Sequence, residues 1–196
     1  MIPFPEVTEA TPTPIGLDIA LNALYETFNK GWLLGMTFRR AYQNTVAGKM
    51  GGLVSSPQVY LGGGRYYNCL PNDNYTHTLF FRTDGPERPN IDKGERRGGR
   101  VTATLSERPL SLVFWCDLTR ITPGYGGDYI YTEKIKEDFV KRLYRLSCVK
   151  SIESMEDSSF ERVFEGYDMP DEKKQYNKYP FACLRIDFTV VFKPSC

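Results

Sequence analysis

The chain has 196 residues, of which 41% are hydrophobic and 14% are aromatic, a composition typical of a folded domain with a sizeable core. Its 25 basic and 24 acidic residues nearly cancel, so the overall charge gives no reason to expect binding to nucleic acid or to an anionic membrane. Apolar runs fall short of the roughly 20 residues that a membrane span needs, and no secretory signal is visible. We therefore expect one domain over residues 1–196, made in a cytoplasm and without a membrane partner.

The first segment, residues 1–13, is rich in proline and threonine and therefore predicts an extended arm and not a helix. Ile2, Phe4 and Val7 are its apolar side chains and would anchor the arm on another surface. Two interpretations stay open: an arm that docks on a neighbouring subunit, and a frayed terminus.

An amphipathic helix is predicted over residues 14–30, with Thr13 as N-cap and Pro14 as the first helical residue. Its apolar stripe recurs at steps of three and four residues and consists of Leu17, Leu21, Leu24 and Phe28. Lys30 in the last turn and Gly31 after it mark the end.

Short strands separated by glycine turns are predicted next. The segments with strand composition are residues 37–42, 58–61, 65–70 and 76–81. We expect 65–70 to form a hairpin with 57–61.

Residues 82–100 form a long segment with almost no apolar side chains and much glycine and proline. Such a loop inside a compact domain is usually functional or disordered. It ends in a basic cluster made of Lys93, Arg96, Arg97 and Arg100. We interpret this cluster as a contact with a nucleic acid backbone or with an acidic neighbouring subunit, the alternative being a solvated mobile loop.

Two further strands, 101–105 and 110–118, precede a loop rich in glycine and tyrosine over 120–131. Val113 and Trp115 make the second face of strand 110–118 partly apolar, which predicts a strand covered on both sides. A second amphipathic helix follows, capped by Thr132. Its buried stripe is predicted to be Ile135, Phe139, Leu143 and Leu146, and its solvated face carries the pairs Glu137–Lys141 and Asp138–Arg142.

The last part of the chain predicts a short strand over 160–164, a charged connection over 168–178 and a long strand over 179–192. In that long strand Leu184, Ile186 and Phe188 alternate with Arg185 and Asp187, so one face builds the core. We expect it to be a central strand. The chain as a whole predicts an α+β fold of two layers: a mainly antiparallel sheet of four or more strands packed with two amphipathic helices, with long loops and the N-terminal arm.

Residues that could carry chemistry are few. His77 is the only histidine and lies in a predicted strand, which favours a structural or surface role. Asp117 and Asp187 could approach each other if their strands are neighbours, and two carboxylates in one cleft are the geometry of a glycosidase, a hydrolase. The sequence gives no reason to prefer this pair over a salt bridge from Asp187 to Arg185 or Arg39. The five scattered cysteines include no C-x-x-C pair and are interpreted as free thiols. We expect no catalytic residue, no cofactor and no metal, and therefore no enzyme.

The order of elements resembles that of the tail-terminator, neck and head–tail joining proteins of tailed bacteriophages. The features that carry the resemblance are the capped N-terminal helix, the glycine-rich hairpin region, the strand Leu112-Val113-Phe114-Trp115-Cys116-Asp117-Leu118, the helix opened by Tyr131-Thr132-Glu133, the Phe-x-x-Val-Phe segment and the closing Tyr-Pro-Phe-Ala-x-Leu-Arg-Ile-Asp-Phe-Thr-Val strand. The chain looks most like ring proteins of phages that infect Bacteroidetes, the crAss-like group included.

The resemblance implies a structural virion protein that forms a homo-oligomeric ring, six-fold or twelve-fold, at the phage neck or tail. The ring would stack on a portal or on neighbouring neck and tail rings, around a channel through which DNA passes without sequence-specific binding. The implied location is the virion, after assembly in the host cytoplasm. Two alternatives stay open: a nucleic-acid-binding module that uses the 93–100 cluster, and an enzyme with a carboxylate site.

Overall fold

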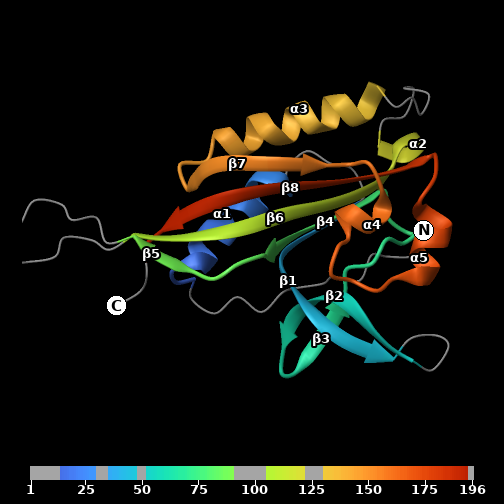
Figure 1. The fold of residues 1–196 in the computed structure, drawn as a ribbon, viewed down its shortest axis with the longest axis horizontal. Helices are drawn as coiled ribbons and strands as arrows, with labels where there is room; N and C mark the ends of the chain where they lie inside the picture. The colour runs from blue at the N-terminus through green and yellow to red at the C-terminus, as the bar shows by residue number, and fades with distance from the viewer. Residues whose placement is uncertain (1–13, 30–34, 48–51, 91–104, 122–129, 194–196) are drawn as a thin grey trace, which may run out of the picture.

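The computed structural model describes residues 14–29, 35–47, 52–90, 105–121 and 130–193 (Figure 1). The helices are α1 (Leu17–Phe28), α2 (Leu118–Ile121), α3 (Ile130–Tyr144), α4 (Phe160–Val163) and α5 (Pro170–Tyr176). The strands are β1 (Met36–Ala47), β2 (Leu53–Gly62), β3 (Arg65–Asn68), β4 (His77–Thr83), β5 (Arg88–Asn90), β6 (Leu105–Asp117), β7 (Val149–Glu156) and β8 (Phe181–Phe192).

All eight strands belong to one sheet, in the order β3-β2-β1-β4-β6-β8-β7, with β5 paired to β6. Every neighbouring pair is antiparallel except β1 and β4, which are parallel. The predicted α+β class with a mainly antiparallel sheet is therefore confirmed.

The sheet has a separate apolar core on each of its faces. One core is formed with α1 and α3, and Phe28, Phe139 and Phe188 lie at its centre. The other core is formed with the shorter α4 and α5, which lie on the opposite side from α1 (Figure 1), and contains Trp115. Strand β6 contributes to both cores because its alternate residues face opposite sides of the sheet.

Strand β8 confirms the predicted alternation. Leu184, Ile186 and Phe188 are at most 1% exposed and lie in the core under α1 and α3. Twelve residues of β8 pair with β6 without interruption, which at about 3.3 Å per residue gives a ladder about 40 Å long. The strand lies between β6 and β7, so it is internal to the sheet but one position from the edge.

Helix α1 confirms the first predicted helix and its buried stripe, but the predicted N-terminus is wrong. The residue that caps the helix is Gly16, with φ 55°, a left-handed conformation that favours glycine. Pro14 therefore precedes the helix, and Thr13, Lys30 and Gly31 lie outside the described residues.

The predicted strands of the first half are confirmed, although β1 and β2 are longer than expected. The hairpin prediction is also confirmed, because β3 pairs with β2 in antiparallel register. The 82–100 segment is partly a strand: β4 runs to Thr83 and β5 pairs with the start of β6. Strand β6 continues through Pro109, where a break between two strands was predicted, and the Pro109 carbonyl accepts a hydrogen bond from the Asp84 amide.

The predicted strand over 160–164 is wrong, because this segment is helix α4. Ser159 caps it by accepting a hydrogen bond from the Arg162 amide, and Phe160, Val163 and Phe164 are buried at helical spacing. A run this short fits either period.

Three other elements were not predicted. Strand β7 pairs with β8 through two register shifts, α5 occupies the predicted charged connection, and α2 begins the predicted loop. Helix α3 starts at Ile130, so Thr132 lies inside the helix and is not its cap. Within the described ranges, no helix has the length and apolarity to span a membrane.

Candidate functional site

The residues that the sequence singled out for contacts lie outside the part of the chain that the structure describes. They are the basic cluster Lys93, Arg96, Arg97 and Arg100 and the arm residues Ile2, Phe4 and Val7. Their roles as channel, subunit or arm contacts therefore stay predictions, and the site has to be built from other residues.

The structure places His77 in the sheet, as predicted for a structural residue. It is 2% exposed at the start of β4. Its ring lies 5.8 Å from the ring of Phe114, centroid to centroid, and its Nδ1 lies 3.3 Å from the Thr76 hydroxyl. Burial lowers the pKa of His77 to about 4, so the imidazole is neutral at physiological pH.

We expect His77 to make the protein less stable as the pH falls from about 6.5 to about 4. In this range the unfolded state, whose histidine has a pKa near 6.5, binds a proton that the folded state does not, so stability rises with pH. The shift corresponds to about 3 kcal/mol. Urea unfolding of the wild type and of His77→Gln as a function of pH should show the stability advantage of the wild type shrinking by about this amount. A difference between the two proteins that is independent of pH would contradict the assignment.

Gly35 lies directly against the ring of His77, and a Cβ atom at this position would overlap the imidazole. Because the ring is buried, we expect Gly35→Ala to lower the free energy of unfolding by about 2 kcal/mol or more. Gly52→Ala is the matched control, since its Cβ would meet nothing within 4 Å. Equal unfolding free energies for the two variants would show that the ring can move aside.

The cysteines in the described ranges behave as small apolar residues. Cys69, Cys116, Cys148 and Cys183 are free thiols, as predicted. Burial raises the pKa of Cys116 and raises that of Cys183 to about 12, so both remain protonated and unreactive at neutral pH. Cys196 lies outside the described residues.

Asp117 and Asp187 do not form a carboxylate pair, although their strands are neighbours. The β6–β8 register places Asp117 opposite Phe181 and Asp187 opposite Ser111. The two carboxylates are therefore six residues apart along the ladder, about 20 Å. The hydrolase geometry that the sequence left open for this pair is excluded.

Asp187 and Asp84 instead both contact the hydroxyl group of Ser111. The Ser111 side chain contacts a carboxylate oxygen of Asp84 and lies 2.5 Å from Oδ1 of Asp187. Each carboxylate has its own arginine: Arg82 pairs with Asp84, and Nε of Arg185 lies 3.1 Å from Asp187. The charges are compensated within the cluster, so we interpret it as a structural link between β4, β6 and β8.

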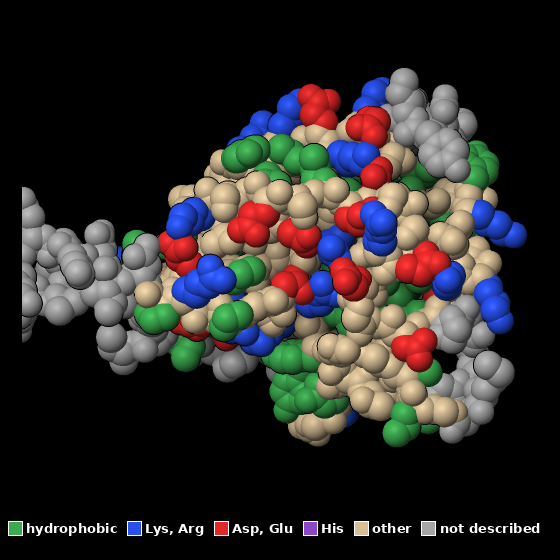
Figure 2. All heavy atoms as spheres, viewed as in Figure 1, with side chains coloured by type: hydrophobic (Ala, Val, Ile, Leu, Met, Phe, Trp, Pro, Cys, Tyr) green, Lys and Arg blue, Asp and Glu red, His purple; other side chains and the backbone are tan. Residues whose placement is uncertain are grey.

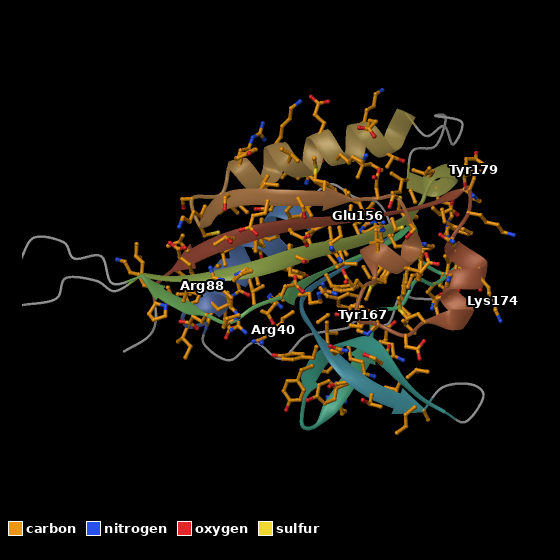
Figure 3. The ribbon with its side chains drawn as sticks, viewed as in Figure 1. Arg40, Arg88, Glu156, Tyr167, Lys174 and Tyr179 are labelled. Atoms are coloured by element: carbon orange, nitrogen blue, oxygen red, sulfur yellow. The ribbon has the colours of Figure 1, made fainter. Side chains whose placement is uncertain are left out.

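The clearest unpartnered surface among the described residues is one face of the β1–β3 strands. Tyr42, Tyr60 and Tyr66 lie on this face, and we call them the tyrosine face; they are 39%, 37% and 49% exposed. The rings of Tyr60 and Tyr66 are cross-strand partners 5.2 Å apart, and the Arg40 guanidinium lies 4.8 Å from the Tyr42 ring centre (Figure 3). Hydrophobic side chains gather at this end of the molecule (Figure 2).

Exposed apolar residues also occur at the opposite end of the strand order. Tyr144, the last residue of α3, is 67% exposed, and Met155 on β7 is 52% exposed. Strands β3 and β7 are the two ends of the sheet order, so these two residues and the tyrosine face lie at opposite sides of the sheet. Tyr144 lies near the start of β7 and Met155 near its end, about 20 Å apart along the strand. Tyr179, 48% exposed, lies before β8 (Figure 3) and lines a pocket with Asp157 and Ser158, just after the end of β7.

The two outermost strands, β3 and β7, are poor partners for a further strand. Strand β3 has four residues, and the ladder of β7 is broken by two register shifts. Short or bulged edge strands disfavour edge-to-edge pairing. Contacts with other chains are therefore expected through side chains and not through an extended sheet.

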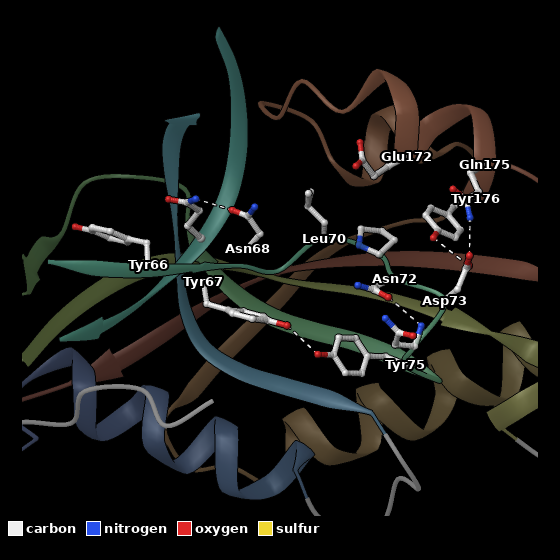
Figure 4. Close-up of a pocket in the computed structure, with 13 residues that line it drawn as sticks. Tyr66, Tyr67, Asn68, Leu70, Asn72, Asp73, Tyr75, Glu172, Gln175 and Tyr176 are labelled. Carbon is white, nitrogen blue, oxygen red and sulfur yellow. Dashed lines mark hydrogen bonds between the residues drawn. The ribbon is translucent and has the colours of Figure 1, made fainter. Parts of the chain in front are cut away.

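A polar hollow of about 720 Å³ lies between β3, the turn that follows it and α5 (Figure 4). Its lining consists of tyrosines, carboxamides and two carboxylates, with Leu70 and Pro71 as the apolar members. Asp73 fixes one wall by accepting hydrogen bonds from Gln175 Nε2 at 2.8 Å and from the Tyr176 hydroxyl at 3.0 Å. No sequence pattern pointed to this hollow, because its residues come from separate segments.

Comparison with protein-family models, with curated proteins and with solved structures gives no match for this chain. Within the described residues, no group of three or more histidine, cysteine, aspartate or glutamate side chains is placed to hold a metal ion. The functional argument therefore rests on the surfaces and contacts described above.

Proposed function

We propose that the chain is a structural virion protein that forms a homo-oligomeric ring at the neck or tail of a tailed bacteriophage, in head–tail joining or tail termination. The observation that carries the proposal is that most of the exposed large apolar side chains of the described residues lie at the two ends of the sheet order. Those at one end are Tyr42, Leu53, Tyr60 and Tyr66, and those at the other are Tyr144 and Met155.

Two different surfaces, the tyrosine face and the side of the sheet along which Tyr144 and Met155 lie, suit a head-to-tail contact. When the tyrosine face of one subunit meets the α3–β7 end of the next, the contact is heterologous, and repetition closes into a ring if the rotation permits. Tyrosine is enriched among the residues that dominate binding energy at protein interfaces. The shortened and bulged edges keep the assembly from growing by strand addition.

The partners follow from this role. They are other copies of the chain in six- or twelve-fold symmetry, a portal or neighbouring ring proteins of the neck and tail, and DNA that passes through the channel. Basic and acidic side chains are interspersed on the face drawn in Figure 2, which suits a smooth conduit better than continuous gripping of DNA. The proposed location is the virion.

Native mass measured by light scattering, with negative-stain images of the same peak, tests the proposal. Rings of six or twelve subunits, formed alone or on a co-expressed portal, are the expected result. A protein that remains monomeric both alone and with the portal would contradict it. Duplex binding that Arg96→Ala and Arg97→Ala abolish, together with a steep salt dependence, would favour the nucleic-acid-binding module instead.

A further inference from the structure

We propose that the polar hollow between β3, the following turn and α5 is a binding site for a neutral saccharide. This inference does not rest on ring formation, because only Tyr66 of its residues also belongs to the tyrosine face and its test is a separate one. The volume of about 720 Å³ lies within the range typical of small-molecule sites.

The charges of the lining exclude anionic ligands. The described lining contains no lysine or arginine, while Asp73 and Glu172 are acidic. The two carboxylates would repel a phosphate, a nucleic acid or an acidic peptide, and no lysine or arginine in the described lining would offset that repulsion. Leu70 and Pro71 supply too little apolar surface to hold a hydrophobic ligand by burial.

The free polar groups match hydroxyl groups, which donate and accept at the same time. Asn68 uses its Oδ1 to accept a hydrogen bond from Gln58 Nε2 at 2.5 Å, and Asn72 uses its Oδ1 to accept one from the Asn74 amide at 2.9 Å. Both amides are thereby oriented, and their NH₂ groups remain without a partner among the described residues. They are donors that are already positioned for a ligand.

Acceptors complement these donors. The Glu172 carboxylate has no hydrogen-bond partner within the described ranges and lines the hollow from α5. A carboxylate accepts hydrogen bonds from two adjacent hydroxyls through its two oxygens, and such charge-assisted bonds are stronger than neutral ones. A ligand that carries neighbouring hydroxyl groups satisfies Glu172 without needing a charge of its own.

Tyrosines complete the site. The hydroxyls of Tyr67 and Tyr75 lie 2.8 Å apart and form a hydrogen bond (Figure 4), and burial raises the pKa of Tyr67, which stays protonated at neutral pH. Tyr66 forms the outer rim with half of its surface exposed. Its ring offers an apolar face to the C–H side of a pyranose.

The walls are rigid enough for the site to exist before the ligand arrives. The Asp73 carboxylate holds α5 through Gln175 and Tyr176, and the Asp73 carbonyl accepts a hydrogen bond from Arg120 at 2.5 Å. Tyr176 in turn packs edge-on against Trp115 in the core, with ring centroids 5.0 Å apart. Side chains locked in this way reduce the entropy that a ligand must overcome.

The test is a titration of the ¹⁵N-labelled protein, in which the side-chain amide signals of Asn68 and Asn72 are followed. The probes are maltose, cellobiose, lactose and N,N′-diacetylchitobiose. We expect saturable shifts for at least one of them, with a dissociation constant on the order of 1 mM, which is typical of a few hydrogen bonds without charge pairing. Added salt should leave the affinity unchanged.

Two variants separate the site from the fold. Glu172→Gln keeps the shape and removes the charge-assisted bonds, so the affinity should fall about tenfold; Asn68→Ala should lower it similarly. Glu137→Gln on α3 is the matched control and should bind as the wild type does. The absence of shifts with all four saccharides would overturn the inference. So would shifts produced only by spermidine and removed by salt, since they would identify a site for cations.

Discussion

Replacing Phe139 with alanine is expected to lower the free energy of unfolding by about 4 kcal/mol. Phe139 is fully buried, and its ring packs edge-on against Phe28 at 5.1 Å and Phe114 at 4.9 Å, centroid to centroid. The side chain thus joins α3 to α1 and to β6. The surrounding rings belong to rigid elements and cannot collapse into the space, so the variant retains a cavity as well as losing buried apolar area.

Urea denaturation followed by circular dichroism measures this loss. Phe139→Leu fills much of the cavity and should lower the free energy of unfolding by roughly 1.5 kcal/mol. Arg145 is exposed just after α3, and Arg145→Ala should change the free energy of unfolding by less than about 0.5 kcal/mol. A loss below about 1 kcal/mol for Phe139→Ala would mean that α3 does not depend on this contact.

The double variant Tyr42→Ser and Tyr60→Ser is expected to abolish ring formation and leave a folded monomer. Both side chains are more than one-third exposed in the isolated chain, so their loss costs little in folding. Central tyrosines at an interface each contribute about 2 kcal/mol or more to association. In a ring this loss is repeated at every contact. Native mass measured at fixed protein concentration reports the result.

Ile19→Ser is the control for this variant. Ile19 is 56% exposed on α1, which packs on the sheet against β1 and β8, so it lies outside both proposed contact surfaces. The control should assemble as the wild type does. Loss of assembly in the control, or persistence of the ring in the double variant, would move the interface away from the β1–β3 strands.

The parts of the fold that could be predicted are those with a long, regular pattern. The alternation along β8 and the apolar stripes of α1 and α3 extend over twelve residues or more, which is enough to distinguish a period of two from one of 3.6. Cap positions were harder to predict, because the left-handed conformation of Gly16 has no periodic signature.

Short elements escaped prediction because their patterns fit two structures. Phe160, Val163 and Phe164 are spaced for a helix, yet the composition of the five-residue segment 160–164 also fits a strand. Strand β7 carries two register shifts that disrupt its alternation. In such segments the tertiary contacts decide the structure, and the local sequence does not contain them.

The candidate sites depended on strand register, which one sequence does not provide. In the observed register of β6 and β8, Asp187 lies far from Asp117 and beside Ser111 and Asp84. It also brought Tyr42 onto the same face as Tyr60 and Tyr66. Residues far apart in the chain came together only when the order and the offset of the strands were known.

Mixing two assembly-defective variants tests head-to-tail association most directly. One variant carries Tyr42→Ser and Tyr60→Ser, and the other carries Tyr144→Ser and Met155→Ser. Each should be monomeric alone. Their mixture retains one intact pair of complementary patches, so the account predicts a heterodimer that does not grow further. A mixture that stays monomeric, or variants that each form homodimers, would contradict the heterologous contact on which the ring proposal rests.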